Sequence, residues 1–119
     1  MNKQAIYFVV SFQINDGKLE AFKEVGQAMI AATQKESGAL GYEWHFSSDH
    51  KRCRLLETYA DQSAVEAHIN GEAVKQIPKL LESASISGFE VYGDPGPEAA
   101  KTLKGFGAEL FQFWRGLNR

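Results

Sequence analysis

The residues best suited to chemistry in this sequence are His68 and Glu57. His68 follows Ala64 and Val65 on the apolar stripe of a predicted helix, so we expect its imidazole to face a sheet. An imidazole with an ordinary pKa of about 6.5 could take a phenolic proton as a general base. In the other interpretation, His68 ends a helix and interacts with its last carbonyls and its dipole. The sequence leaves both roles open.

Glu57 lies in a predicted strand and shares a face with Leu55 and Tyr59. If that face is covered, the carboxyl group is buried and needs a partner. It could orient a catalytic histidine or bind a substrate hydroxyl. It could instead form a structural ion pair with Arg52 or Arg54, and these nearby arginines favour the structural role.

Aromatic side chains alternate along the next strand upstream, where Tyr42, Trp44 and Phe46 are expected to share one face with Leu40. With Tyr59 they could form the wall of a site for a planar phenolic ligand. An ordinary hydrophobic core would show the same pattern. His45 points to the opposite face of that strand, and His50 lies in a polar turn where we expect it to be solvated.

The sequence gives no sign of a metal or nucleotide cofactor. The three histidines are predicted on a strand, a turn and a helix, at spacings that match no local metal-binding motif. No glycine-rich phosphate-binding motif occurs either. We therefore expect a site without a cofactor.

Hydrophobic periodicity predicts an α+β chain in the order βαββαβ, which is typical of the ferredoxin-like fold. A helix of about five turns is expected from Leu19 to Ser37, and the second crossover should be a bent helix pair interrupted by Pro78. All helices should then cover one face of an antiparallel sheet. The strands are expected at residues 5–14, 40–47, 52–59 and 84–92.

The last part of the chain is predicted to extend this unit. Residues 1–93 complete the βαββαβ order, and residues 94–119 are expected to be a Pro/Gly linker followed by an amphipathic helix from Glu98 to Leu117. We expect that helix either to cap a pocket or to swap onto a partner subunit. Its apolar stripe consists of Leu103, Phe106, Leu110, Phe113, Trp114 and Leu117.

Composition excludes several partners. With a net charge of −2 over 119 residues and no basic stripe, the chain is not suited to bind nucleic acid. No apolar run is long enough to span a bilayer, so no membrane insertion is expected. The single cysteine, Cys53, fits a reducing cytoplasm. Apolar residues on both strand faces predict a homodimer that buries the face without helices.

Three short motifs resemble the antibiotic biosynthesis monooxygenase family over residues 5–93. They are Glu36-x-Gly38-x-x-x-Tyr42, Glu57-x-Tyr59-x-Asp61 and Ala64-x-x-x-His68, in that order. The resemblance implies a ferredoxin-like fold and a dimeric α/β barrel formed through the sheets. It also implies the oxygenation of a phenol or quinol without metal or flavin.

The expected function is therefore that of a cofactor-independent monooxygenase, an oxidoreductase acting on a small aromatic with O2. We expect His68 and Glu57 to be catalytic, and Tyr42, Trp44, Tyr59 and Phe46 to bind the substrate. A dimer that only binds a small hydrophobic molecule is the alternative. Haem handling is a third possibility, but haem-degrading members of the family usually carry tryptophan at the position of Tyr59.

Overall fold

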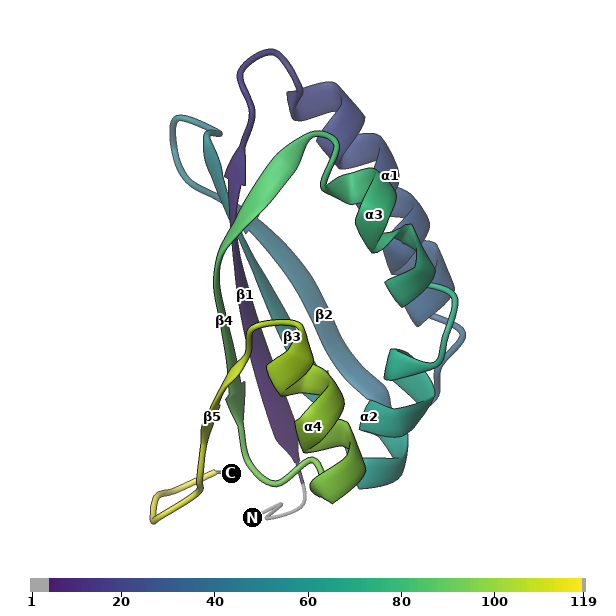
Figure 1. The fold of residues 1–119 in the computed structure, drawn as a ribbon, viewed down its shortest axis with the longest axis vertical. Helices are drawn as coiled ribbons and strands as arrows, with labels where there is room; N and C mark the ends of the chain where they lie inside the picture. The colour runs from purple at the N-terminus through teal and green to yellow at the C-terminus, as the bar shows by residue number, and fades with distance from the viewer. Residues whose placement is uncertain (1–4, 119) are drawn as a thin grey trace.

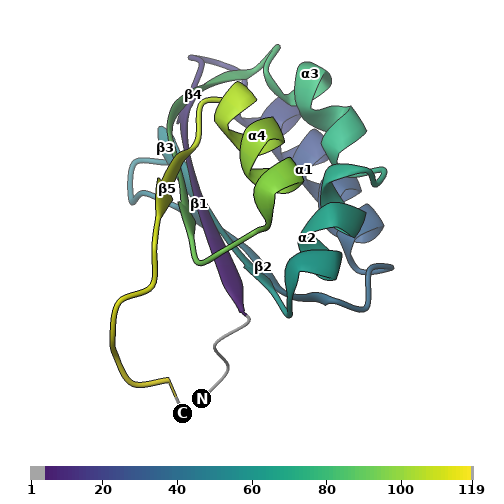
Figure 2. The same ribbon diagram turned by 60° about the horizontal axis from the view of Figure 1, so that its bottom comes forward.

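The computed structural model describes residues 5–118, which form a five-stranded sheet with helices over one face (Figures 1 and 2). The strand order is β2-β3-β1-β4-β5, and all neighbours are antiparallel except β4 and β5. The predicted α+β, βαββαβ order with an additional C-terminal helix is confirmed. The elements are β1 (Ile6–Ile14), α1 (Leu19–Thr33), β2 (Ala39–Phe46), β3 (Arg52–Tyr59), α2 (Gln62–Ile69), the 3₁₀ turn η1 (Val74–Gln76), α3 (Ile77–Leu80), β4 (Ala84–Tyr92), α4 (Pro97–Gly105) and β5 (Glu109–Phe111).

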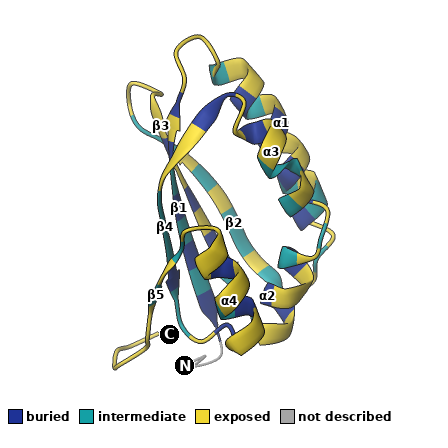
Figure 3. Ribbon diagram, in the orientation of Figure 1, coloured by how far each residue is buried: buried dark blue, intermediate teal, exposed yellow. Residues whose placement is uncertain are grey.

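The central strand β1 shows how the sequence positions the core. Its even-numbered residues are buried toward the helices, and its odd-numbered residues are half-buried or exposed on the other face (Figure 3). This alternation follows from the two-residue period of a strand. β1 pairs with β3 on one side and β4 on the other, so both of its edges are satisfied.

β2 departs from the predicted alternation at its start. The sequence placed Leu40 on the same face as Tyr42, but the pairing of β2 with β3 shifts between Ala39 and Gly41. Such an irregularity takes one residue out of the pleat. The prediction was therefore wrong for Leu40, whose side chain is 60% exposed.

Helix α1 packs through aromatic contacts against the sheet. Phe22 is fully buried, and its ring makes edge contacts with Phe12 of β1 and Trp44 of β2, with ring centroids 5.5 and 5.7 Å apart. Met29 is buried further along the same helix face. Burial of large apolar side chains of this kind contributes roughly 1.5–3 kcal/mol each.

The second crossover is broken into short helices, as predicted. α2 begins with Asp61, whose carboxylate accepts a hydrogen bond from the Ala64 amide at 2.9 Å, a cap that stabilises a helix by about 1 kcal/mol. Pro78 lies in the first turn of α3, where its missing N–H costs no hydrogen bond. This arrangement lets α2 and α3 cover different parts of the sheet (Figure 1).

The C-terminal helix is shorter than predicted. A helix to Leu117 was expected, but α4 ends at Gly105 because Gly107 adopts a positive φ of 92°. The Gly107 amide donates to the Lys104 carbonyl and the Ala108 amide donates to the Leu103 carbonyl, which together form a Schellman motif. The chain then forms β5 instead of continuing the helix. Phe113, Trp114 and Leu117, which were predicted to lie on the apolar stripe of this helix, are therefore outside α4 and exposed.

None of the helices within residues 5–118 combines the length and the apolar character needed to cross a bilayer.

Candidate functional site

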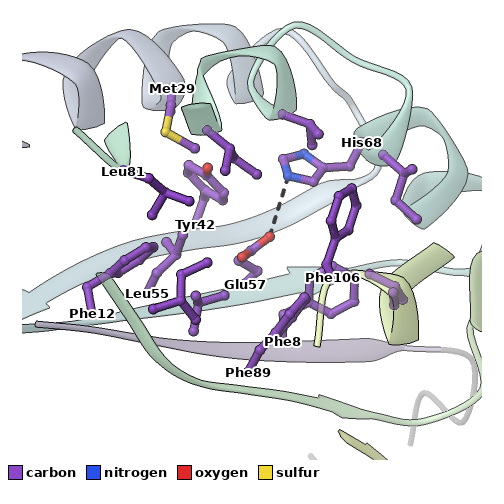
Figure 4. Close-up of a pocket in the computed structure, with 16 residues that line it drawn as sticks. Phe8, Phe12, Met29, Tyr42, Leu55, Glu57, His68, Leu81, Phe89 and Phe106 are labelled. Atoms are coloured by element: carbon purple, nitrogen blue, oxygen red, sulfur yellow. Dashed lines mark ion pairs between the residues drawn. The ribbon is translucent and has the colours of Figure 1, made fainter. Parts of the chain in front are cut away.

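A pocket of about 210 Å³ lies between the sheet and the helices (Figure 4). Its floor comes from β1, β3, β4 and Tyr42 of β2, and the helical segments from α1 to α4 form its walls. Its lining is almost entirely apolar, apart from a group of polar side chains at one end. The lining residues are Phe8, Val10, Phe12, Met29, Tyr42, Leu55, Glu57, His68, Ile69, Val74, Ile77, Leu81, Ile86, Phe89, Leu103 and Phe106.

His68 is held at the polar end by Glu36. The His68 Nδ1 atom lies 2.9 Å from Glu36 Oε1, and the side chains are 6% and 15% exposed. Because the Glu36 carboxylate only accepts hydrogen bonds, this contact places the histidine proton on Nδ1. Nε2 is then the basic nitrogen, and it faces Glu57 and the pocket.

Glu57 is buried beneath His68 and bonded to Tyr59. The Tyr59 hydroxyl donates to Glu57 Oε1, and His68 Nε2 lies 3.5 Å from the same oxygen (dashed line in Figure 4). The Tyr59 ring also packs against the imidazole, with centroids 5.0 Å apart. Arg52 and Arg54 are exposed, and the partners of Glu57 are the tyrosine and the histidine instead.

Burial controls the protonation of this cluster. Desolvation raises the pKa of Glu57 to about 8, against the hydrogen bond from Tyr59, which lowers it. Desolvation also lowers the pKa of His68, although the contact with Glu36 opposes this change. At neutral pH the contact between them therefore joins a protonated carboxyl group and a neutral imidazole, not two opposite charges. An acid and a base thus lie side by side.

Two glycines allow the turn after α1 to reach α2. A methyl group on Gly38 would lie 2.5 Å from the Ala64 side chain, and one on Gly71 would lie 2.8 Å from Glu36 Oε2. Contacts this short cannot be accommodated without moving the backbone or the carboxylate. The hydrogen bond between Glu36 and His68 therefore depends on glycine at both positions.

The structure brings some of the expected site residues together and separates others. His68, Glu57 and Tyr42 line the pocket, and Tyr59 lies directly behind Glu57. The Tyr42 ring is 5.6 Å from the His68 ring, and desolvation raises the pKa of its hydroxyl.

Trp44 and Phe46 lie elsewhere. They line a separate groove of about 310 Å³ with α1 residues such as Gly26. The Trp44 ring stacks on Phe12, with centroids 6.0 Å apart, and so supports the floor of the pocket from outside. Neither residue is among those that line the central pocket.

Sequence reasoning missed Glu36 as a functional residue. It appears in the first of the three motifs, but it lies 32 positions before His68, and only the fold shows that they meet. Leu103 and Phe106 of the C-terminal segment line the pocket, and a cap over a pocket was one of the two placements expected for that segment. Their place on the apolar side of a predicted amphipathic helix was the available signal.

The polar cluster was also considered as a metal or haem site. Within residues 5–118, no group of three or more His, Cys, Asp or Glu side chains is arranged to hold a metal ion. His68 does not fit the role of an axial haem ligand, because Glu36 and Glu57 face its two ring nitrogens.

Comparison with known proteins gives a family and several structures. Residues 5–79 match the family model described as antibiotic biosynthesis monooxygenase. No curated protein gave a significant match. The crystal structure of MupZ from Pseudomonas fluorescens is 25% identical, with a TM-score of 0.79 over 98% of this chain and 95% of that one.

Two more distant structures show the same fold. A protein from Caulobacter crescentus described as a candidate antibiotic biosynthesis monooxygenase is 21% identical, with a TM-score of 0.66 over 76% of this chain and 89% of that one. A similarly described protein from Nitrosomonas europaea is 20% identical, with a TM-score of 0.67 over 82% of this chain and 96% of that one.

Proposed function

This chain belongs to the antibiotic biosynthesis monooxygenase family, and from that premise we propose that it oxidises a small neutral phenol or quinol with O2. One observation carries the proposal. The contacting side chains Glu36, His68, Glu57 and Tyr59 form a polar cluster at one wall of a pocket that is otherwise apolar. This arrangement suits a flat apolar molecule with one hydroxyl group.

The charge of the pocket supports a neutral substrate. None of the sixteen lining residues, all within the described part of the chain, is Lys or Arg, and the two lining or adjoining carboxyl groups belong to Glu57 and Glu36. A substrate carboxylate would be desolvated there without a cationic partner. The pocket volume of about 210 Å³ is modest. For comparison, a cavity of about 150 Å³ holds one benzene molecule. One or two fused rings are therefore the expected size.

We assign His68 the role of the base. Nε2 is the nitrogen without a proton, and a ligand hydroxyl at the polar end would lie within its reach. The imidazolium that forms would be stabilised by Glu36, which also fixes the ring orientation. Glu36 is therefore a positioning residue, and His68 is the catalytic one.

The oxidation itself balances without an added reductant. With 1-naphthol, removal of the hydroxyl proton gives a phenolate that donates electrons to O2 from a ring carbon. A carbon–oxygen bond forms at that carbon, and the carbon–hydrogen bond there and the O–O bond then break. The ring hydrogen leaves as a proton on the departing hydroxide, so the products are naphthoquinone and one water. The substrate supplies all four electrons. Protonated Glu57 would donate the other proton of that water to the leaving oxygen. The His68 imidazolium would then pass the proton taken from the substrate to the Glu57 carboxylate.

Oxygen uptake with 1-naphthol and naphthalene-1,4-diol tests this proposal. The metal-stripped protein should consume O2 with either compound, with one O2 per quinone formed from 1-naphthol. The matched substrate 1-hydroxy-2-naphthoate should react at least about tenfold more slowly, because its carboxylate must be buried next to Glu57. Equal rates for the neutral and carboxylated compounds would contradict the proposed substrate class.

The almost wholly apolar lining also favours a second candidate, a dimer that binds a small hydrophobic molecule without changing it. The same experiment separates the two functions. Tight binding of 1-naphthol with no oxygen uptake by the protein would support binding alone.

We also propose that two copies associate through the sheet face without helices. Tyr7 and Val9 are only half-buried there and Leu56 is exposed, so a partner sheet would remove apolar area from water. Sedimentation equilibrium should give twice the mass of one chain, and Leu56→Lys should shift the mass toward that of a monomer. A monomeric parent protein at micromolar concentration would contradict this assembly.

A cytoplasmic location is part of the same proposal. The free thiol of Cys53 is buried and unpaired, as expected in a reducing compartment, and cell fractionation would test it.

A further inference from the structure

We propose that Phe106 is the gating residue of the pocket, whose ring controls the escape of ligands and limits their size. The inference rests on the pocket as a ligand site and does not require that the ligand be oxidised. It concerns the C-terminal segment, which lies beyond the residues 5–79 that match the family model.

The exposure of the lining residues locates the mouth of the pocket. Phe8 and Phe12 on the floor are buried, whereas Phe106 lines the same pocket and is 52% exposed. Leu81 and Ile86 are the other large apolar lining residues that are exposed, at 40% and 38%. A side chain that contacts both the cavity and the solvent marks the boundary between them.

The position of Phe106 is set by the end of α4. The residue is the C-cap, and its amide donates to the Leu103 carbonyl at 3.0 Å. The Schellman bonds that follow, closed by Gly107, fix the backbone at this point. The fixed backbone holds the ring at the pocket, where Figure 4 shows it beside the polar end with His68.

The side chain nevertheless has space to rotate. Phe106 is 52% exposed, so the solvent side of its ring is not packed against the protein. Rotation of a partly exposed aromatic side chain about χ1 is fast compared with ligand turnover. Opening the pocket therefore requires movement of one ring and no rearrangement of the fold.

The interior of the pocket comes largely from the matched family region, including all the polar groups. Phe106 is supplied by the end of α4, which the family match does not include. Changing this residue should therefore alter which ligands fit and how fast they leave. It should not alter the acid–base chemistry at the other residues.

Stopped-flow fluorescence of 1-naphthol binding under argon tests the proposal, because no oxidation occurs without O2. Phe106→Ala should raise the dissociation rate constant about tenfold or more, and Phe106→Trp should lower it. Phe106→Ala should also gain affinity for the larger 1-hydroxypyrene relative to 1-naphthol. Phe111→Ala is the matched control, because this phenylalanine is exposed on β5 and does not line the pocket.

Equal dissociation rates for the parent protein and both Phe106 variants would overturn the proposal, as would an equal effect of Phe111→Ala. Binding that follows the expected order without oxygen uptake in air would leave the gating role standing and remove only the oxidation. Failure of the parent protein to bind either probe would overturn both proposals.

Discussion

Replacing His68 with Gln is expected to lower kcat/KM for 1-naphthol oxidation by about 10²–10⁴, the usual contribution of a positioned general base. Glutamine can still form a hydrogen bond, but its amide cannot take a proton at neutral pH. The rate of quinone formation, followed by absorbance, measures the effect.

The matched control is His45→Gln. His45 is exposed on β2, where its Nε2 lies 3.2 Å from Glu43 Oε1, and it does not line the pocket. The same chemical change there should leave kcat/KM within about twofold of the parent value, because a surface change rarely alters a buried site. Comparable losses in the two variants would show that His68 has no special role.

Glu36→Gln separates positioning from catalysis. The introduced amide would still occupy the space beside His68 Nδ1 but would carry no charge to stabilise the imidazolium. We therefore expect a smaller loss of kcat than in His68→Gln, together with a lower pKa for the acidic limb of the pH–rate profile. If Glu36 had a purely structural role, the pKa of the acidic limb would be the same in Glu36→Gln as in the parent protein.

Glu57→Gln is expected to remove a pH dependence of stability. The folded-state pKa of Glu57, about 8, lies above the ordinary value of 4.5, so the folded chain holds a proton that the unfolded chain has released. The stability from this group is complete below pH 4.5 and is lost as the pH rises toward 8. The two pKa values give an upper bound of about 5 kcal/mol for the whole range.

His68 contributes with the opposite sign. Its folded-state pKa lies below 6.5, so its contribution is lost as the pH falls below 6.5. Of these two groups, Glu57 is the one whose contribution changes between about pH 6.5 and 8, and the free energy of unfolding should fall by up to about 2 kcal/mol over that range. Urea unfolding at several pH values measures this slope.

In Glu57→Gln the slope between about pH 6.5 and 8 should be flat, whereas the exposed control Glu66→Gln should keep the parent slope. Glu57→Gln should also lose the basic limb of the pH–rate profile, because Glu57 is proposed to donate a proton to the leaving oxygen. A parent protein whose stability does not change over this range would show that Glu57 is already ionised in the fold.

The regular elements were predictable because their signals are local. The alternation in β3 and the apolar and aromatic run in β4 indicated their bounds directly, and Pro78 marked the break in the second crossover. The three motifs also identified the family.

The C-terminal segment was not predictable from its apolar spacing alone. Gly107 ends α4 through its backbone geometry, and this effect outweighs the periodicity of the residues that follow. The pairing irregularity that exposes Leu40 likewise depends on register with β3, which a single strand does not reveal.

His68 and Glu57 were selected from the faces on which they lie, and the two side chains do meet in the fold. Their catalytic role stays a prediction. The partner of His68 was missed because a contact across 32 positions has no local signature. The aromatic residues of β2 divide between two cavities, because α1 packs over Trp44 and Phe46 but leaves Tyr42 open to the central pocket.

Substitutions at Gly38 and Gly71 would affect how a mutational survey of this protein is interpreted. Neither lies among the pocket residues, yet any side chain at either position presses on Ala64 or on the Glu36 carboxylate. In a saturation library scored by activity, both positions would be sensitive to substitution, as the acid–base residues are. A map of sensitive positions would therefore overstate the extent of the ligand site, and only folding measurements on the same library would separate the two groups.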